Sequence, residues 1–135
     1  EPWIPVSGTH GEIHVAEEER AERENRPSVL GYYKRMLKLR QELPSMRRGT
    51  FRSVKTDCTS CVVFTKTYDS ERILVVVNVG PAVRTVHLEE SGLFSGRAVL
   101  STLLLGNYFA PHSDEAEGEE RTCVLYPYEA RIYRL

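Results

Sequence analysis

The chain has 135 residues, of which 41% are hydrophobic, so it suffices for one domain and is too short for a complete (β/α)8 barrel of about 250 residues. Its 18 basic and 19 acidic residues give a formal charge of −1, and we therefore expect no nucleic-acid partner. The longest apolar run, Ile73 to Val77, is far shorter than the roughly 18 residues of a membrane-spanning helix. Residues 1–26 lack the apolar segment of a signal peptide.

The first part of the chain changes from an irregular segment to a helix. Residues 1–16 predict an irregular extended arm, and residues 17–26, which are polar on all sides, predict a short exposed helix or a linker. Residues 28–43 follow helical spacing between a start signal at Ser28 and a stop at Pro44. The apolar positions of this helix are Val29, Tyr32, Tyr33, Met36, Leu37, Leu39 and Leu43. This broad face must be covered, either by the strands that follow or by a body absent from this chain; a membrane-surface helix is the rival interpretation.

From residue 50 the hydrophobic period changes to two, which is typical of strands. The expected strands are residues 50–55, 61–67, 72–79, 82–88, 97–102, 122–126 and 130–135. Residues 73–77 are apolar on both faces, so this strand is expected to be central and covered on both sides. Residues 110–120 are expected to form a long exposed loop. The pattern predicts a mainly β fold, an antiparallel sandwich or open barrel.

The cysteines leave their own state open. Cys58 and Cys61 have the spacing of redox and zinc motifs, but zinc would need a second ligand pair that the sequence does not offer. One disulfide with a free third cysteine, or three plain thiols including Cys123, are the simpler alternatives. The segment HGEIH at residues 10–14 lacks the spacing of a helical metal motif. We therefore expect no metal site and no cofactor.

The acidic residues do not form a recognisable catalytic pair. Acid–base catalysis on glycosides needs two carboxylates on opposed, rigid elements. The acids here cluster in residues 12–26 and 112–121, and neighbouring acids such as Glu89 and Glu90 or Glu119 and Glu120 fall on expected loops. His87 and His112 have no nucleophile partner that the sequence identifies, and Trp3 and the tyrosines are more typical of a core than of a sugar-binding surface. We expect no catalytic residue in this chain.

Four stretches occur in a familiar order: PWIPV at residues 2–6, SVLGYYKRMLKLR at 28–40, LPSMRRGTF at 43–51 and LYPYEA at 125–130. VFTK at 63–66 and LVVVNVG at 74–80 lie between them. Together they resemble the C-terminal part of glycoside hydrolase family 13, the α-amylase superfamily, and are most similar to its maltase and oligo-1,6-glucosidase branch. The resemblance implies that residues 1–45 end a catalytic (β/α)8 barrel, with an irregular arm and the final barrel helix. Residues 46–135 would then form the C-terminal β-sandwich domain.

The resemblance also implies a function. The parent would be an α-glucosidase (maltase) that hydrolyses terminal α-linked glucose with retention, and this segment would be a structural module that stabilises the upstream barrel of the same polypeptide. The family's catalytic Asp, Glu and second Asp come from barrel strands upstream of residue 1, so none carries over. An extracellular location, or a membrane-anchored one facing outside, is expected.

Two alternatives remain at this point. One departure from the family pattern is Ser7 to His10, where such glucosidases often continue with Asn-Pro-Asn-Tyr near the pocket. The non-catalytic heavy chains of amino-acid transporters share the barrel and sandwich and are the leading alternative. A free-standing sandwich that binds carbohydrate through exposed aromatic residues is a third possibility.

Overall fold

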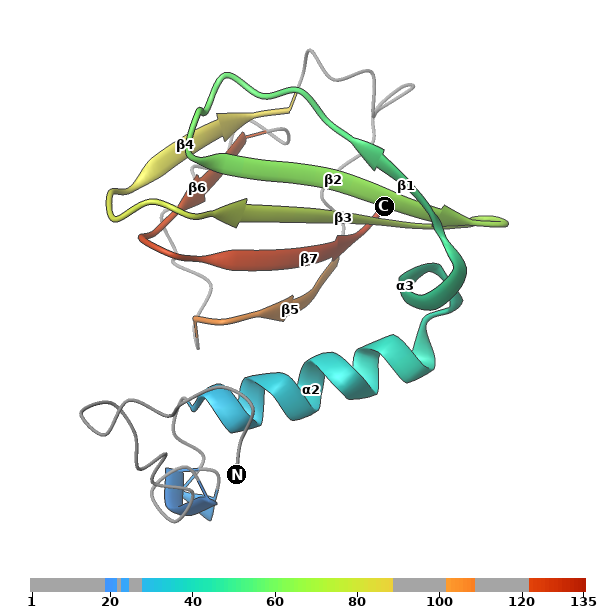
Figure 1. The fold of residues 1–135 in the computed structure, drawn as a ribbon, viewed down its shortest axis with the longest axis vertical. Helices are drawn as coiled ribbons and strands as arrows, with labels where there is room; N and C mark the ends of the chain where they lie inside the picture. The colour runs from blue at the N-terminus through green and yellow to red at the C-terminus, as the bar shows by residue number, and fades with distance from the viewer. Residues whose placement is uncertain (1–18, 22, 25–27, 89–101, 109–121) are drawn as a thin grey trace, which may run out of the picture.

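The computed structural model describes residues 19–21, 23–24, 28–88, 102–108 and 122–135 (Figure 1). Residues 19–21 and 23 are helical. The helices and strands that follow are α2 (Val29–Glu42), α3 (Pro44–Arg48), β1 (Thr50–Ser53), β2 (Cys61–Tyr68), β3 (Glu71–Asn78), β4 (Arg84–His87), β5 (Thr102–Gly106), β6 (Thr122–Leu125) and β7 (Ala130–Arg134). Among the described residues, no helix is both long and apolar enough to cross a membrane.

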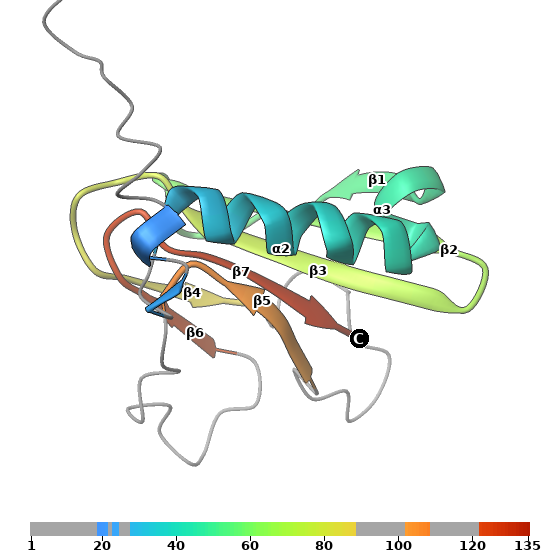
Figure 2. The same ribbon diagram turned by 90° about the horizontal axis from the view of Figure 1, so that it is seen from below.

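The strands form two unequal antiparallel sheets. The larger has the order β1-β2-β3-β7-β5, and the smaller consists of β4 and β6. Figure 2 shows the smaller sheet on one side of the larger one and α2 on the other. The predicted mainly β, antiparallel fold is therefore confirmed, with a helix layer added to the sandwich.

β3 lies at the centre of the larger sheet and contributes to two cores. Leu74 and Val76 are fully buried toward β4 and β6, in what we call the inner core. Ile73 and Val75 face the opposite way, toward α2, in the outer core. Each buried side chain of this size stabilises the fold by about 1.5–3 kcal/mol relative to its exposed state. The expectation of a central strand covered on both sides is confirmed.

Helix α2 begins and ends at the predicted signals. The Ser28 Oγ accepts a hydrogen bond from the Gly31 N–H at 2.9 Å and caps the first turn. Pro44 ends α2 but also begins the short helix α3, which the sequence analysis did not predict, because proline fits the first position of a helix. After α3 the chain turns at Gly49, where a Cβ would overlap the Ser45 carbonyl oxygen, so only glycine fits without a shift.

The predicted strand boundaries are close except for β5. Of the strand expected at 97–102, only Thr102 lies within the described residues, and β5 runs on from there to Gly106. β5 pairs with β7 with a shift in register between Leu103 and Leu105, so Leu104 is an extra residue that the period-two pattern did not anticipate. The arm at 1–16 and the expected loop at 110–120 lie outside the described residues.

Candidate functional site

Helix α2 has two apolar stripes, and the structure covers only one of them. Tyr32, Met36 and Leu39 pack against the outer core, together with Leu43, which is buried. The second stripe, Val29, Tyr33 and Leu37, repeats every four residues and is 77%, 63% and 47% exposed. The helix therefore contacts its own sheet and also presents a second apolar surface to the outside.

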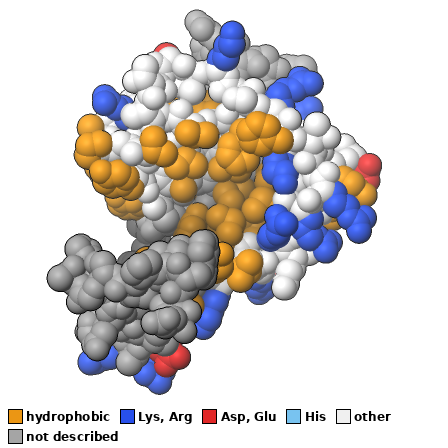
Figure 3. All heavy atoms as spheres, in the orientation of Figure 1, with side chains coloured by type: hydrophobic (Ala, Val, Ile, Leu, Met, Phe, Trp, Pro, Cys, Tyr) orange, Lys and Arg blue, Asp and Glu red, His pale blue; other side chains and the backbone are white. Residues whose placement is uncertain are grey.

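The larger sheet also leaves part of its outer surface uncovered. Val62 is 48% exposed and pairs with Val77, which packs against the outer core, so Val62 lies on the α2 side of the sheet. Phe51 is 60% exposed, and its ring centroid lies 5.0 Å from that of Phe64. Figure 3 shows hydrophobic side chains gathered over the sheet and in the hollow between the sheet and α2.

We call the exposed stripe of α2, Val29, Tyr33 and Leu37, the docking face; Phe51 and Val62 add exposed apolar side chains on the same side of the sheet. Single exposed apolar residues are common on proteins, but several gathered on one side mark an interaction surface. The arrangement favours contact with another apolar body rather than chemistry on a small molecule.

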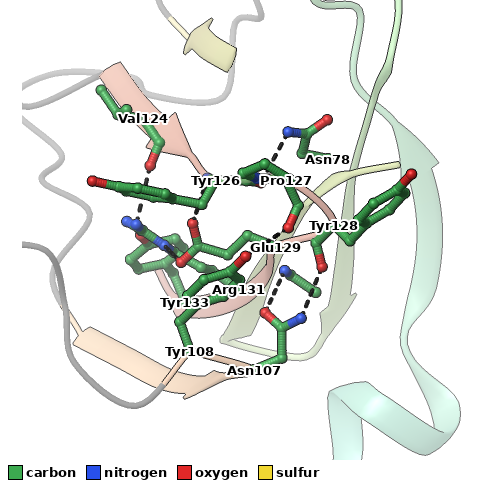
Figure 4. A network of polar contacts seen from close by, with 11 residues as sticks. Asn78, Asn107, Tyr108, Val124, Tyr126, Pro127, Tyr128, Glu129, Arg131 and Tyr133 are labelled. Atoms are coloured by element: carbon green, nitrogen blue, oxygen red, sulfur yellow. Dashed lines mark hydrogen bonds and ion pairs between the residues drawn. The ribbon is translucent and has the colours of Figure 1, made fainter. Parts of the chain in front are cut away.

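A buried ion pair anchors the turn between β6 and β7 (Figure 4). Glu129 and Arg131 are each 3% exposed, and the Arg131 Nε donates to the Glu129 Oε1 at 2.8 Å. The Tyr126 N–H donates to the second carboxylate oxygen at 2.7 Å, and Arg131 also donates to the Val124 carbonyl and to the Tyr133 hydroxyl. Burial alone would lower the pKa of Arg131, but the hydrogen bonds with Glu129 and Tyr133 raise it, so the guanidinium stays charged.

Two asparagines fix the backbone around the same turn. The Asn78 amide donates to the carbonyls of Ala82 and Tyr126 at 2.7 and 2.9 Å, and its oxygen accepts from the Gly80 N–H. The Asn107 amide donates to the Tyr128 carbonyl and accepts from the Ala130 N–H. Tyr128 has a φ of 57°, a left-handed conformation that a non-glycine residue adopts only when its surroundings hold it there. This network is structural, because its members use their polar atoms on one another.

Several of the described carboxylates serve as partners of other protein groups. Asp57 pairs with the His87 Nδ1 at 2.8 Å, and this hydrogen bond holds the pKa of Asp57 below its ordinary value. Glu71 accepts the Ser45 N–H, which likewise lowers the pKa of Glu71. No group of three or more His, Cys, Asp or Glu side chains within the described ranges is placed to hold a metal ion.

Several residues weighed in the sequence analysis lie outside the described part of the chain: Trp3, the segment 10–14, Glu89, Glu90, His112, Glu119 and Glu120. The expectation that this chain holds no catalytic residue therefore stays a prediction.

The structure decides among the alternatives for the cysteines. Cys58 and Cys61 form a disulfide with their Cα atoms 5.2 Å apart, and Cys123 is not disulfide-bonded and is buried in the inner core. The disulfide closes the connection between β1 and β2 beside a shallow polar pocket. The residues that line this pocket are Asp57, Cys58, Thr59, Val83, Arg84 and Thr85.

Two similar curated proteins are oligo-1,6-glucosidases. The enzyme of Parageobacillus thermoglucosidasius is 31% identical over 134 residues, which is 99% of this chain and 22% of that protein. The probable oligo-1,6-glucosidase 2 of Bacillus subtilis is 30% identical over 139 residues, covering 99% of this chain and 21% of that protein. This chain therefore spans about a fifth of the length of the relatives that it matches. No family model matches it.

Solved structures show the same fold. The trehalulose synthase MutB superposes with a TM-score of 0.74 at 24% identity, over 100% of this chain and 22% of that chain. The isomaltulose synthase PalI of Klebsiella sp. LX3 superposes with a TM-score of 0.71 at 25% identity, over 99% of this chain and 22% of that chain. The unequal antiparallel sheets and these relatives together place the chain in glycoside hydrolase family 13, as a counterpart of the C-terminal β domain of its enzymes.

Proposed function

We propose that this chain is the C-terminal part of an α-glucosidase that hydrolyses terminal α-linked glucose, and that its own role is to stabilise a (β/α)8 barrel upstream in the same polypeptide. Residues 1–45 would end the barrel and residues 46–135 would form the C-terminal domain. The names of the related oligo-1,6-glucosidases support an α-glucoside substrate, and the small share of their length that this chain spans leaves room for a barrel.

The docking face is the observation that carries the structural role. Tyr33 and Leu37 stay well exposed although α2 already covers the outer core with its other stripe. A helix with two apolar stripes is suited to lie between two bodies, because each stripe covers a different one. In this proposal the barrel occupies the exposed side.

The chemistry would lie on the barrel. Retaining glycosidases place two carboxyl groups about 5–5.5 Å apart, one as nucleophile and one as acid and then base. In this chain, by contrast, Asp57 binds His87, Glu71 accepts the Ser45 N–H, and Glu129 pairs with Arg131. This chain would contribute stability to the catalytic site and no reacting group.

The related proteins do not favour the transporter-associated alternative, because the matched curated proteins are glucosidases.

For location we propose the extracellular side, either secreted or membrane-anchored. The disulfide Cys58–Cys61 supports this proposal, since disulfides persist mainly in oxidising compartments.

The experiment compares a charge on each side of α2, in the isolated chain and in a longer polypeptide that includes the upstream barrel. Tyr33→Glu changes the docking face, and Lys38→Glu, at an exposed position of the same helix that pairs weakly with Glu42, is the control. In the isolated chain both variants should change the unfolding free energy by about 1 kcal/mol or less. In the longer polypeptide Tyr33→Glu should cost about 2 kcal/mol or more, because it buries an unpaired charge.

The readout in the longer polypeptide is the half-life of p-nitrophenyl α-glucoside hydrolysis on heating, which Tyr33→Glu should shorten and Lys38→Glu should leave nearly unchanged. The isolated chain should show no hydrolysis. Equal effects of Tyr33→Glu in both forms would contradict the structural role, and turnover by the isolated chain would contradict the location of the chemistry.

A further inference from the structure

We propose that the Cys58–Cys61 disulfide is a thiol-exchange site, at which a small-molecule thiol attacks Cys58 from the neighbouring pocket. The proposal does not depend on the glucosidase function. It starts from an asymmetry between the two cysteines. Cys58 lines the shallow pocket beside β4, whereas Cys61 is the first residue of β2, where it pairs with Asn78. Both cysteines are partly buried against the inner core, but of the two only Cys58 lines the pocket, so a thiol that enters the pocket lies beside Cys58.

The surroundings of Cys58 suit a thiolate. Arg84 lines the same pocket, and its Nε donates to the Ser60 Oγ at 3.1 Å. That hydroxyl lies 3.6 Å from the Cys58 Sγ, within hydrogen-bonding distance for sulfur. The Arg84 guanidinium attracts an incoming thiolate into the pocket, and the same cation and the Ser60 hydroxyl stabilise the Cys58 thiolate that is released in the second step of the exchange. The Asp57 carboxylate, which binds the His87 ring at 2.8 Å, also lines the pocket and opposes this attraction, so the Arg84 charge is what makes the approach of a thiolate favourable.

The loop keeps its shape through hydrogen bonds that do not involve the disulfide. The Cys58 N–H donates to the Thr56 Oγ1 at 2.9 Å, and the Cys61 N–H donates to the Cys58 carbonyl at 3.2 Å. The Val79 N–H donates to the Ser60 carbonyl at 2.9 Å and ties the loop to the residue after β3. Opening the disulfide thus leaves the two sulfur atoms side by side, which makes the exchange reversible.

The exchange consists of two balanced steps. A thiolate attacks the Cys58 sulfur, the bond to Cys61 breaks, and the Cys61 thiolate leaves and takes up a proton from water. The product is a mixed disulfide on Cys58. A second thiolate then attacks the small molecule's sulfur and releases Cys58, so that two thiols are oxidised to one disulfide and the protein disulfide is reduced to two thiols. In the reverse direction, the Cys61 thiolate attacks Cys58 and restores the starting state.

Reduced glutathione is the probe, added to the folded, oxidised chain and followed by intact mass and by peptide mapping after acid quench. We expect the first product to carry a single glutathione, attached at Cys58, with Cys123 unmodified because it is buried in the inner core. In Arg84→Gln the initial rate of adduct formation should fall about threefold to tenfold, and Arg84→Lys should restore most of it, because the attraction of the thiolate depends on the positive charge.

The matched control is Arg52→Gln, which removes an exposed arginine from β1, outside the pocket. It should leave the rate within about a factor of two of the unchanged chain. Three results would overturn the proposal: no adduct on the folded chain, an adduct on Cys61 instead of Cys58, or modification of Cys123 in step with Cys58, which would show that the reaction proceeds through unfolded chain. Equal slowing by Arg84→Gln and Arg52→Gln would also overturn it.

Discussion

Arg131 and Glu129 lie in the interior of the molecule, where each charge depends on the other. The Glu129 carboxylate also accepts a hydrogen bond from the Tyr126 N–H, and Arg131 reaches the Val124 carbonyl and the Tyr133 hydroxyl as well. Such a pair is not by itself a large source of stability, because both ions have lost their contact with water. Its importance appears when one partner is removed.

Arg131→Met should therefore destabilise the chain strongly, because it leaves the Glu129 carboxylate buried without its cation. We expect a loss of about 3–5 kcal/mol in the unfolding free energy, measured by urea unfolding followed by circular dichroism. Arg134→Met on the same strand is the control, and at that exposed position the loss should stay below about 1 kcal/mol. Similar losses in the two variants would contradict a special role for the buried pair.

At this scale the sequence was informative about caps and less so about long-range partners. Ser28 was identifiable as a helix start because its partner lies three residues away. Asn78 was not, because it reaches Tyr126, which is 48 positions distant. The pairing of Cys58 with Cys61 stayed open for the same reason: Cys123 could compete until the fold placed it in the inner core.

At the scale of elements, α3 is joined to β3 through one carboxylate. The Ser45 N–H of α3 donates to the Glu71 Oε1 at 2.8 Å, and the Lys66 ammonium of β2 donates to the Met46 carbonyl. The hydrogen bond from Ser45 lowers the pKa of Glu71 from its ordinary value of 4.5, although partial burial opposes the shift. A lowered pKa in the folded state means that the ionised form stabilises the fold.

This stabilisation is fully present above pH 4.5 and is lost as the pH falls through the pKa of Glu71 in the folded chain. In Glu71→Gln the free energy of unfolding should consequently fall less steeply on acidification below that pH. The measurement is a series of urea unfolding curves from neutral to acid pH, with a carboxyl titration by NMR. Asp69→Asn, in the same hairpin, should keep the steep fall of the unfolding free energy at acid pH. If Glu71→Gln kept this steep fall as well, the stabilising role of the hydrogen bond between Ser45 and Glu71 would be disproved.

The elements that are evident from the sequence are those whose own hydrophobic pattern determines them. Elements whose limits depend on pairing with a distant strand are not evident from the sequence. β3 was identifiable because five consecutive apolar residues can be satisfied only by cover on both faces. The end of β5 was expected at Thr102 but lies at Gly106, because its register is set by pairing with β7 and includes a bulge at Leu104. α3 is not evident from the sequence, because a proline that ends one helix can also begin the next one, as Pro44 does.

At the scale of the whole molecule, the sequence left open whether the helix is covered by the chain's own strands or by a body absent from this chain, and the first possibility is realised in part. One stripe of α2 packs on the chain's own sheet, and the other is exposed. α2 therefore has partial cover from the sheet, but none of its residues is buried.

Hydrogen exchange of the isolated chain should be slower in the larger sheet than in α2. Amides of β3 and β7, which pair with neighbours near the middle of the larger sheet, should exchange slowest, and those of α2 at least about tenfold faster. Peptide-level mass spectrometry would measure the difference. In a polypeptide that also contains the upstream barrel, the difference in exchange rate between the strands and α2 should become smaller. Equal protection of α2 and β3 in the isolated chain would show that the docking face needs no further cover.

The position of β7 beside the central strand has a consequence for synthesis on the ribosome. β3 meets β2 through a tight hairpin as soon as residue 78 has emerged, but it gains its other neighbour only when residues 130–134 follow. Until then the nascent hairpin carries a bare strand edge and an unfinished core, the kind of intermediate that chaperones shield. A premature stop codon a few codons ahead of residue 130 would leave the polypeptide permanently in that state.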